Sequence, residues 1–405
     1  MNLALLISAS SLLIAATTFV INWRKSAGEV NAQQLDDVLD HVRAHYAQLN
    51  VASREAARAQ WTGTLPILTK PGWLFTPPVP LASVNLTLLE PVEEDLELKR
   101  TLAKAARALP GIRGVRSFSS YTEALKKLDR LGSLYNGRIY RVLSVHTEAR
   151  RLDLTFSTGS YFDHLNTSLV LTLEAAARHL AGRRNILTGR YRRWLHDPFE
   201  IHRRSPGLGV NTLTIRRSPG LSTFFLHRRD GSFVAEGPDI VHVIPAGEFT
   251  PSDIGLGAIR QDFDLWKNIM REYGEEFLNV EEAYGRGGRP IDYRREEPFH
   301  RLDEAYRRGE LTVRVFGFGL DLLDWKPSLY TVAVIDAPAF DRLFAGMVPT
   351  GPEGTVIVGP EGHGIPFTEE NIRLYADNPG TVNAGAVCLE LAWRHREALG
   401  VAPSS

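Results

Sequence analysis

Three glutamates close together in the C-terminal half are the strongest candidates for chemistry: Glu272, Glu275 and Glu276. They belong to the segment 271–277, Arg-Glu-Tyr-Gly-Glu-Glu-Phe. Residues three and four apart share one face of a helix, so a helix here places Glu272 beside the other two. Crowded carboxylates repel each other unless a cation lies among them, and Mg²⁺ suits an all-oxygen ligand set. A solvated acidic helix surface is the alternative interpretation.

The residues around the glutamates predict the elements that position them. Apolar side chains recur at helical spacing from near Asp262 onward: Phe263, Trp266, Ile269, Met270, Tyr273 and Phe277. This period predicts an amphipathic helix with one buried face. Upstream, the β-rich run 240–244 leads into Pro-Ala-Gly-Glu, in which Gly247 lies, and Asp253 follows in the loop. A strand, a loop and the acidic helix are therefore expected in that order.

In this order the chain resembles the Nudix hydrolase family. The family motif has a glycine, five residues, a glutamate, seven residues, and then Arg-Glu-hydrophobic-x-Glu-Glu-x-Gly-hydrophobic. Gly247, Asp253 and the residues 271–276 resemble this motif, and the resemblance covers about residues 205–397. It implies a Nudix-like mixed-sheet α/β/α sandwich as the fold of the C-terminal domain.

The chain departs from the family motif at several positions. Asp253 stands where the family has glutamate, and Leu278 stands at the position of the glycine after the helix. Seventeen residues (254–270) separate Asp253 from Arg271 instead of seven, so about ten extra residues enlarge the loop within 254–268. A second register, with Gly257 as the motif glycine, keeps the distance to the helix but places Phe263 at the glutamate position.

The resemblance implies a role for each residue of the motif. Glu275 and Glu276 would bind Mg²⁺ or Mn²⁺, with Glu272 as a further ligand or as the general base. The carbonyl of Gly247 would complete the coordination, and Arg271 would hold a glutamate in place through a salt bridge. The family reaction is the hydrolysis of a nucleoside diphosphate linked to another group.

Substrate contacts are expected from neighbouring strands and from a late loop. Arg216 and Arg228 lie on β-rich runs, where they could meet substrate phosphates, although the pleat sends alternate residues to opposite faces. A late loop supplies a base in this family, so Glu361 and His363 are further candidates. The arginines belong to a strongly basic block: Arg183, Arg184, Arg190, Arg192, Arg193, Arg203, Arg204, Arg216, Arg217, Arg228 and Arg229. A solvated face is the alternative interpretation of this block.

An uncharged run at residues 3–21 predicts a membrane anchor. As a helix it is roughly 28 Å long, close to the ~30 Å hydrocarbon core of a bilayer. Trp23, Arg24 and Lys25 follow it, as an interfacial aromatic and a positive flank. A cleaved signal peptide would carry its positive charge before the apolar run, and a buried core helix is the third possibility. The positive flank favours a single-pass protein of the cell membrane with its bulk in the cytoplasm.

Composition and length limit the remaining possibilities. The chain has 405 residues and a formal net charge of +0, so no global charge points to a nucleic-acid partner. A single cysteine, Cys388, excludes an intrachain disulfide and a cysteine-based zinc site. The expected divisions are a transmembrane anchor at 1–25, a small α+β region at 30–150, a helical connector at 151–204, and the Nudix-like α/β domain at 205–400.

Three functions are compatible with these patterns. The first is a membrane-anchored Nudix-type hydrolase that cleaves a nucleoside diphosphate-linked substrate with Mg²⁺. The second is a catalytically degenerate Nudix-like module that binds a nucleotide ligand as a sensor, regulator or membrane effector. The third is a scaffold whose 30–150 region binds a partner at the membrane. The patterns leave the oligomeric state open.

Overall fold

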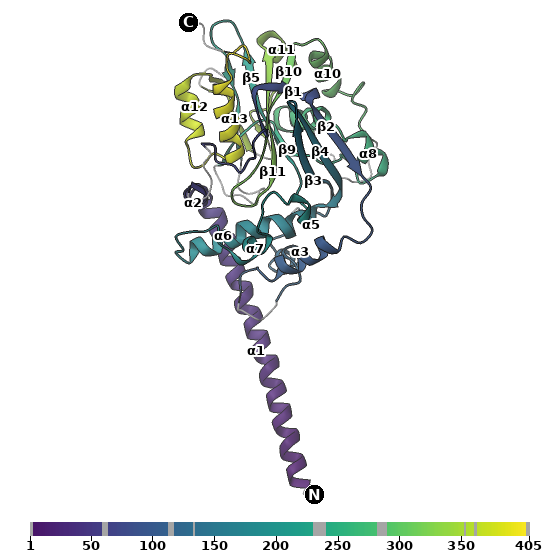
Figure 1. Cartoon of the computed structure of the whole chain (residues 1–405), viewed down its shortest axis with the longest axis vertical. Coiled ribbons are helices and arrows are strands. Elements are labelled where there is room, and N and C mark those ends of the chain that lie inside the picture. Colours follow the sequence, from purple (N-terminus) through teal and green to yellow (C-terminus); the bar gives the residue numbers. More distant parts are fainter. Residues whose placement is uncertain are drawn as a thin grey trace.

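In the computed structural model of this protein, one long helix projects from a body of sheets and helices (Figure 1). The structure describes residues 3–58, 64–111, 117–132, 134–229, 240–281, 290–351, 354–359 and 363–401; for residues 3–16, 19, 229 and 351 it describes the backbone alone. The projecting helix is α1 (Leu3–Ala44), whose N-terminus lies far from the body.

Helix α1 contains two segments that were predicted from the sequence as separate elements. The uncharged run and the amphipathic segment expected at 31–49 form one continuous helix as far as Ala44, and α2 (Tyr46–Arg58) follows. Leu35, Val38 and Val42 are buried at helical spacing, so this part of α1 packs against its own body. Its partner is α6 (Val170–Leu180), where His179 Nδ1 lies 2.8 Å from His41 Nε2.

Most side chains of the predicted membrane span, residues 3–21, lie outside the described part of the chain. Within the described residues, none of the helices combines the length and the apolar character needed to cross a bilayer.

A seven-stranded mixed sheet forms the centre of the body. Its order is β1 (Leu74–Pro80), β10 (Leu311–Leu320), β11 (Pro327–Asp336), β5 (Gly209–Arg217), β6 (Thr223–Phe224) and β14 (Ile365–Pro366), and β9 (Ala246–Glu248) pairs with β5 off this path. β5 and β11 run parallel, whereas the other pairs are antiparallel. The α/β class and the mixed sheet predicted from the sequence are therefore confirmed.

Helices cover both faces of this sheet. Along β5, Leu213 and Ile215 join one apolar cluster with α12 (Glu369–Ala376) and α13 (Asn383–Arg394). Val210 belongs to the other cluster, which contains α9 (Leu265–Leu278), α10 (Phe299–Arg307) and α11 (Ala337–Leu343). Successive strand residues face opposite sides, so the strand alternation explains the two clusters and the three layers.

Two smaller sheets flank the centre. One has the order β12 (Thr350–Gly351), β13 (Gly354–Ile357), β7 (Leu226–Arg229) and β8 (Ile240–Val243), and the other β2 (Val84–Leu89), β4 (Arg151–Ser160) and β3 (Arg138–Glu148). The shorter helices are α3 (Leu96–Ala106), α4 (Tyr121–Lys127), α5 (Tyr161–His164), α7 (Arg190–Leu195) and α8 (Leu256–Gln261).

The domain boundaries expected at residues 150 and 204 do not match the strand pairing in these sheets. Strand β1, from the 30–150 region, is hydrogen-bonded to β10 of the central sheet. Strand β4, from the expected helical connector, lies between β2 and β3. Strand pairing across both boundaries makes the region before residue 205 part of the same body, because a separate domain would complete its own sheets.

Two arginines of the basic block are buried against the turn between β10 and β11. Arg204 donates to the carbonyls of Asp324 (3.2 Å) and Trp325 (2.9 Å), and Arg192 donates to those of Leu322 and Leu323. Burial lowers the pKa of each guanidinium to about 10, which leaves both charged at neutral pH. These cations hold the turn in place and are not available to a ligand.

Replacing Arg204 by methionine tests this role. The change leaves the carbonyls of Asp324 and Trp325 buried without donors, so we expect the free energy of unfolding to fall by about 2–5 kcal/mol. Urea denaturation of the full chain measures it. Arg184→Met, an exposed position in the same basic block, is the control and should change stability by less than about 0.5 kcal/mol. Equal losses in both variants would contradict a structural role for Arg204.

Candidate functional site

Helix α9 carries the three candidate glutamates and is anchored by its apolar face. Asp264 caps its N-terminus by accepting from the backbone N–H of Lys267 (3.0 Å). Tyr273 and Phe277 are fully buried, and the Tyr273 hydroxyl lies 2.9 Å from that of Thr214 on β5. The predicted helix is confirmed, and its burial on the sheet determines which way the opposite, acidic face points.

Two of the glutamates contact strand β9. A Cβ added at Gly247 would overlap the carboxylate of Glu272, so only glycine allows this approach without moving that side chain. One turn later, Glu276 Oε2 accepts from the backbone N–H of Ala246 (3.0 Å). The structure therefore brings together Gly247, Glu272 and Glu276, as the motif implied. Glu275 is partly exposed on the same helix.

Glu276 is the most enclosed of the three glutamates. Its side chain is 1% exposed, and its Oε1 lies 3.7 Å from Nδ1 of His227 on β7, which is 3% exposed. Together with the bond to Ala246, these contacts connect α9 to both small strands beside it. Glu276 therefore serves as an internal contact between helix and sheets, whatever else it binds.

Arg271 pairs with an aspartate that the motif did not indicate. Its Nη1 lies 3.2 Å from Oδ2 of Asp262, and the two side chains are 6% and 0% exposed. Burial opposes the charge of Arg271, but the neighbouring Tyr293 hydroxyl and the Asp262 carboxylate raise its pKa above the ordinary value. Arg271 thus forms a buried pair with Asp262, and the charges of Glu272 and Glu275 also raise its pKa.

Asp262 also organises the loop in front of the helix. It accepts from the backbone N–H of Ser252 (2.8 Å) and from the hydroxyl of Tyr293 (2.9 Å). Asp253, the residue expected at the family's glutamate position, instead accepts from Gly255 N–H in a local turn (2.8 Å). The long spacer contains helix α8, which separates the two aspartates. The sequence contains one hint of Asp262. It directly precedes Phe263, which stands at the glutamate position of the motif when Gly257 is taken as the motif glycine.

The two arginines expected to bind substrate are not on the acidic face of α9. Arg216 forms two 2.8 Å bonds to Asp341 of α11, and this hydrogen bonding raises its pKa. Arg228 is exposed and follows His227 on β7, so the pleat points it away from the side that faces Glu276. Both positions weaken the expectation that these side chains meet a ligand bound at Glu272–Glu276.

The donor chemistry suits a water-rich magnesium site rather than a protein cage. Among the described residues, no group of three or more His, Cys, Asp or Glu side chains is arranged to hold a metal ion. Mg²⁺ commonly keeps several waters and takes only one or two carboxylates, together with ligand phosphates. Glu272 offers a partly exposed carboxylate beside the backbone of Gly247, and Glu275, also partly exposed, follows one turn later on the helix, so one or two carboxylates are available for that smaller requirement. Of the late-loop candidates, Glu361 lies outside the described residues, and His363 is exposed.

A second polar cluster lies at the other end of β9, and sequence patterns did not indicate it. Glu248 Oε1 lies 3.9 Å from Nε2 of His164, and its Oε2 lies 3.8 Å from Nζ of Lys326. His164 Nδ1 accepts from the backbone N–H of Gly207 (3.2 Å). Burial lowers the pKa of His164 to about 4, so this histidine is neutral in the folded protein.

Comparison with known proteins finds no match: no protein-family model fits this chain, and no curated protein is similar to it.

Replacing Asp262 by asparagine tests the buried ion pair. The change leaves the Arg271 charge buried without its counter-charge, and we expect a loss of about 3–5 kcal/mol in the free energy of unfolding. Chemical denaturation of the full chain measures it. Asp253→Asn is the matched control, because asparagine can still accept from Gly255 N–H. A stability loss in the control as large as that in Asp262→Asn would refute the assignment of Asp262 as the main partner.

His164 predicts a pH dependence of stability. Its pKa is about 4 in the folded protein and near 6.5 in the unfolded chain, so the unfolded chain binds more protons between these values. The free energy of unfolding should therefore fall by up to about 3 kcal/mol as the pH decreases from about 6.5 to about 4. Urea denaturation as a function of pH should show a flatter dependence for His164→Asn. His146→Asn, at an exposed histidine, should keep the slope of the unmodified protein; equal slopes in all three proteins would contradict the role of His164.

Proposed function

We propose that the body of this protein is a Nudix-like module that binds the diphosphate group of a nucleotide-type ligand at the acidic face of α9, and that α1 attaches it to a membrane. The observation that carries the proposal is the packing of Glu272 and Glu276, one helical turn apart, on the strand that contains Gly247. This arrangement sets two carboxylates, one helical turn apart, against the backbone of β9.

Binding without cleavage is the form that the contacts favour. A hydrolase of this kind needs several carboxylates free to coordinate metal ions and to activate water. Here the side chain of Glu276 is enclosed by Ala246 and His227, and Arg271 is engaged with Asp262. Glu272 and Glu275 are partly exposed. We infer a role as a sensor or regulatory module that responds to its ligand.

The acidic face requires a cation to bind a diphosphate. When bound, Mg²⁺ or Mn²⁺ would neutralise the negative charge between carboxylates and phosphate oxygens. Glu272 and Glu275 would hold it, and the carbonyl of Gly247 would complete the protein ligands. The buried Asp262–Arg271 pair fixes the start of α9, and on that helix Glu272 lies against Gly247 of β9 while Glu275 stays partly exposed.

Hydrolysis of a nucleoside diphosphate-linked substrate is the second candidate. Its specific support is that Glu272 and Glu275 stay partly exposed on one face, where one could orient or deprotonate a water while the other contacts the cation. Both candidates bind the same class of ligand, and only the second one cleaves it.

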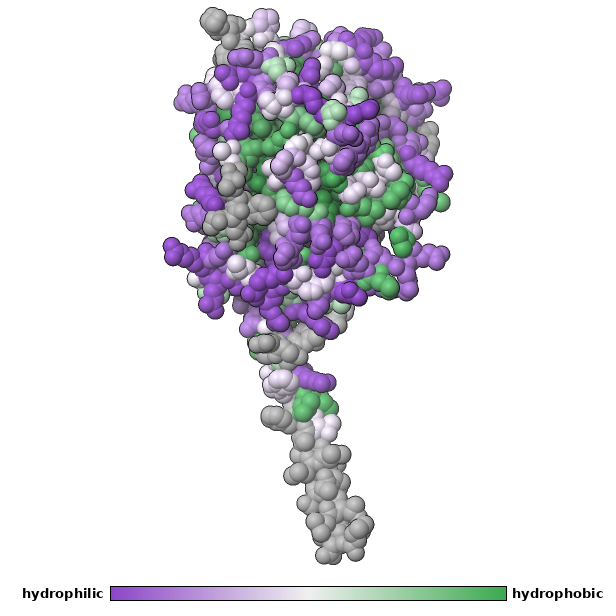
Figure 2. Space-filling view, in the orientation of Figure 1, coloured by the Kyte–Doolittle hydropathy of each residue, from purple (hydrophilic) through white to green (hydrophobic). Residues whose placement is uncertain are grey.

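The membrane part of the proposal rests on the projecting helix. The described side chains of Val20, Ile21 and Trp23 are 44%, 59% and 49% exposed on it, an unusual apolar exposure for a helix in water. Figure 2 shows hydrophilic residues around the outline of the body above this helix, and a hydrophobic area across the middle of the face in view. Arg24 and Lys25 at the membrane-proximal end favour a cytoplasmic body.

The binding proposal is tested with the full chain and a panel of nucleoside diphosphate derivatives. We expect Mg²⁺-dependent binding by titration calorimetry, and a loss of about tenfold or more in affinity for Glu275→Gln, since one ligand charge is removed. Gly247→Ala should weaken binding similarly with little change in melting temperature, because it displaces only the flexible end of Glu272. Glu281→Gln, an exposed change just beyond α9, should bind normally.

The same panel separates the two candidates. Mg²⁺-dependent release of a nucleotide product that is lost in both Glu275→Gln and Glu276→Gln would establish the hydrolase. Binding that is independent of Mg²⁺ and unaffected by Glu275→Gln and Gly247→Ala would rule out both.

A further inference from the structure

A cavity of about 710 Å³ lies where α1 leaves the body, away from the acidic face of α9. Two segments far apart in the sequence line it: Trp23, Arg24, Lys25, Gly28, Glu29 and Ala32 from α1, and Ser117, Phe118, Lys127 and Leu128 from α4 and its flanks. The two walls are joined by a 2.6 Å hydrogen bond from the amide of Asn31, which is 2% exposed, to the hydroxyl of Ser117. The volume is within the range of ordinary ligand sites, roughly 300–1,000 Å³.

The lining is basic and partly aromatic. Arg24, Lys25 and Lys127 face a single carboxylate of the lining, Glu29. Lys127 is paired with Glu123 (2.6 Å), and its Nζ lies 5.6 Å from the ring centre of Phe118. No acidic partner of Arg24 or Lys25 occurs among the residues that the structure describes. The lining holds three cations and one carboxylate, and Glu123 pairs with one of the cations, Lys127, so the cavity keeps a net positive charge that favours an anion.

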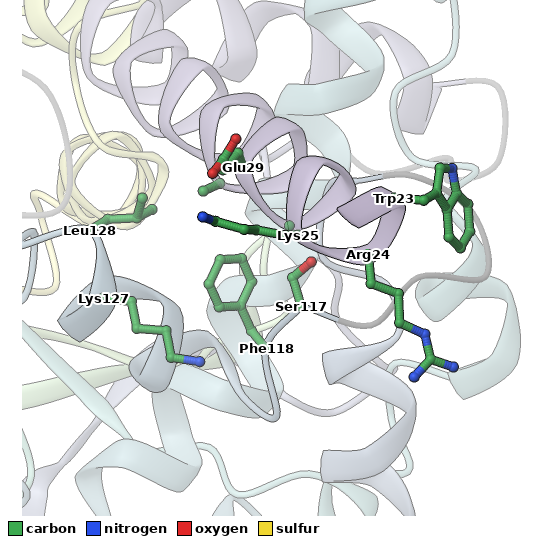
Figure 3. Close-up of a pocket in the computed structure, with 10 residues that line it drawn as sticks. Trp23, Arg24, Lys25, Glu29, Ser117, Phe118, Lys127 and Leu128 are labelled. Carbon is green, nitrogen blue, oxygen red and sulfur yellow. The ribbon is translucent and has the colours of Figure 1, made fainter. Parts of the chain in front are cut away.

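The side chains divide between the interior and the rim of the cavity. In Figure 3, Lys25 extends from α1 on the side of Phe118, and Lys127 approaches the same ring from α4. Trp23 and Arg24 leave α1 in another direction. Lys25 and Lys127 thus approach Phe118 from α1 and from α4, and in this view the ring lies between the two ammonium groups.

The depth of the cavity along α1 points to a lipid as the source of that anion. Lys25 follows Ile21, the last residue of the uncharged run, by four residues, or about 6 Å of helix. The headgroup layer of a bilayer is roughly 5–8 Å thick on each side. If the uncharged run occupies the hydrocarbon core, the cavity opens at the level of the lipid phosphates. Trp23 would then lie at the interface, where indole rings concentrate.

We propose that this cavity binds the phosphate of an anionic phospholipid headgroup between Lys25 and Lys127, and so fixes the body against the membrane surface. The proposal rests on the proposed membrane attachment of α1. It adds a specific lipid site to what would otherwise be an unspecific hydrophobic anchor. Because the site joins α1 to α4, the bound headgroup would also hold the projecting helix at a defined angle to the body.

The test uses the full chain in nanodiscs of phosphatidylcholine alone or mixed with phosphatidylglycerol. Native mass spectrometry counts the phosphatidylglycerol molecules that stay bound after release from the disc. We expect retention of phosphatidylglycerol by the unmodified protein and a roughly tenfold or greater loss in the Lys25→Gln/Lys127→Gln double variant, since each lysine contributes at the surface of an anionic membrane. Arg307→Gln/Arg308→Gln removes two exposed cations from α10, far from α1 in Figure 1, and should retain the lipid.

The possible outcomes separate the claims. Insertion into nanodiscs without phosphatidylglycerol retention, or equal loss in both double variants, would overturn the cavity site while leaving the attachment intact. Failure of the unmodified protein to insert would overturn the attachment and the cavity site together. A parallel titration in detergent with inorganic phosphate identifies the source of the anion: binding as tight as that of phosphatidylglycerol, and lost in Lys25→Gln/Lys127→Gln, would show a phosphate site that is not a lipid site.

Discussion

The buried ion pair between Asp262 and Arg271 is the interaction on which the arrangement of the acidic helix depends. Both side chains are almost fully enclosed, so neither charge can be compensated by water. Asp262 joins the pair to the 250–253 loop through Ser252 and to the following segment through Tyr293. A change that separates the pair would therefore release the loop, the helix start and the Tyr293 segment at once, rather than one contact.

Charge in this protein serves structure more often than the sequence suggests. Arg192 and Arg204 satisfy the carbonyls of a turn, Arg216 is bound to Asp341, and Glu276 connects α9 to neighbouring strands. Each of these groups belongs to a cluster that local sequence presents as a possible ligand-binding surface. The proposed ligand and lipid sites instead use Glu272 and Glu275, which are partly exposed on α9, and Lys25 and Lys127, which line the cavity at the base of α1.

The two proposed sites lie on different parts of one body. The acidic face of α9 packs beside β9, which pairs with β5 at the centre of the large sheet. The basic cavity lies at the base of α1, which packs against α6. Because the sheets and helices between them share a continuous apolar cluster, a ligand at one site and a lipid at the other would act on the same rigid framework. This supports a module that links ligand binding to the membrane surface.

The sequence by itself determined the local features. The helical period before Phe277 follows from spacing over a few residues, which fixes the face a side chain occupies. The closeness of Gly247 to a carboxylate of α9 lies beyond such spacing and was expected only from the resemblance to the Nudix motif. The tertiary structure decided the partners. Arg271 pairs with Asp262, β1 joins the central sheet from more than two hundred residues away in the chain, and Arg216 is bound to Asp341. Partner choice depends on which charges and strand edges folding brings within a few ångströms, and periodicity over neighbouring residues carries no information about that distance.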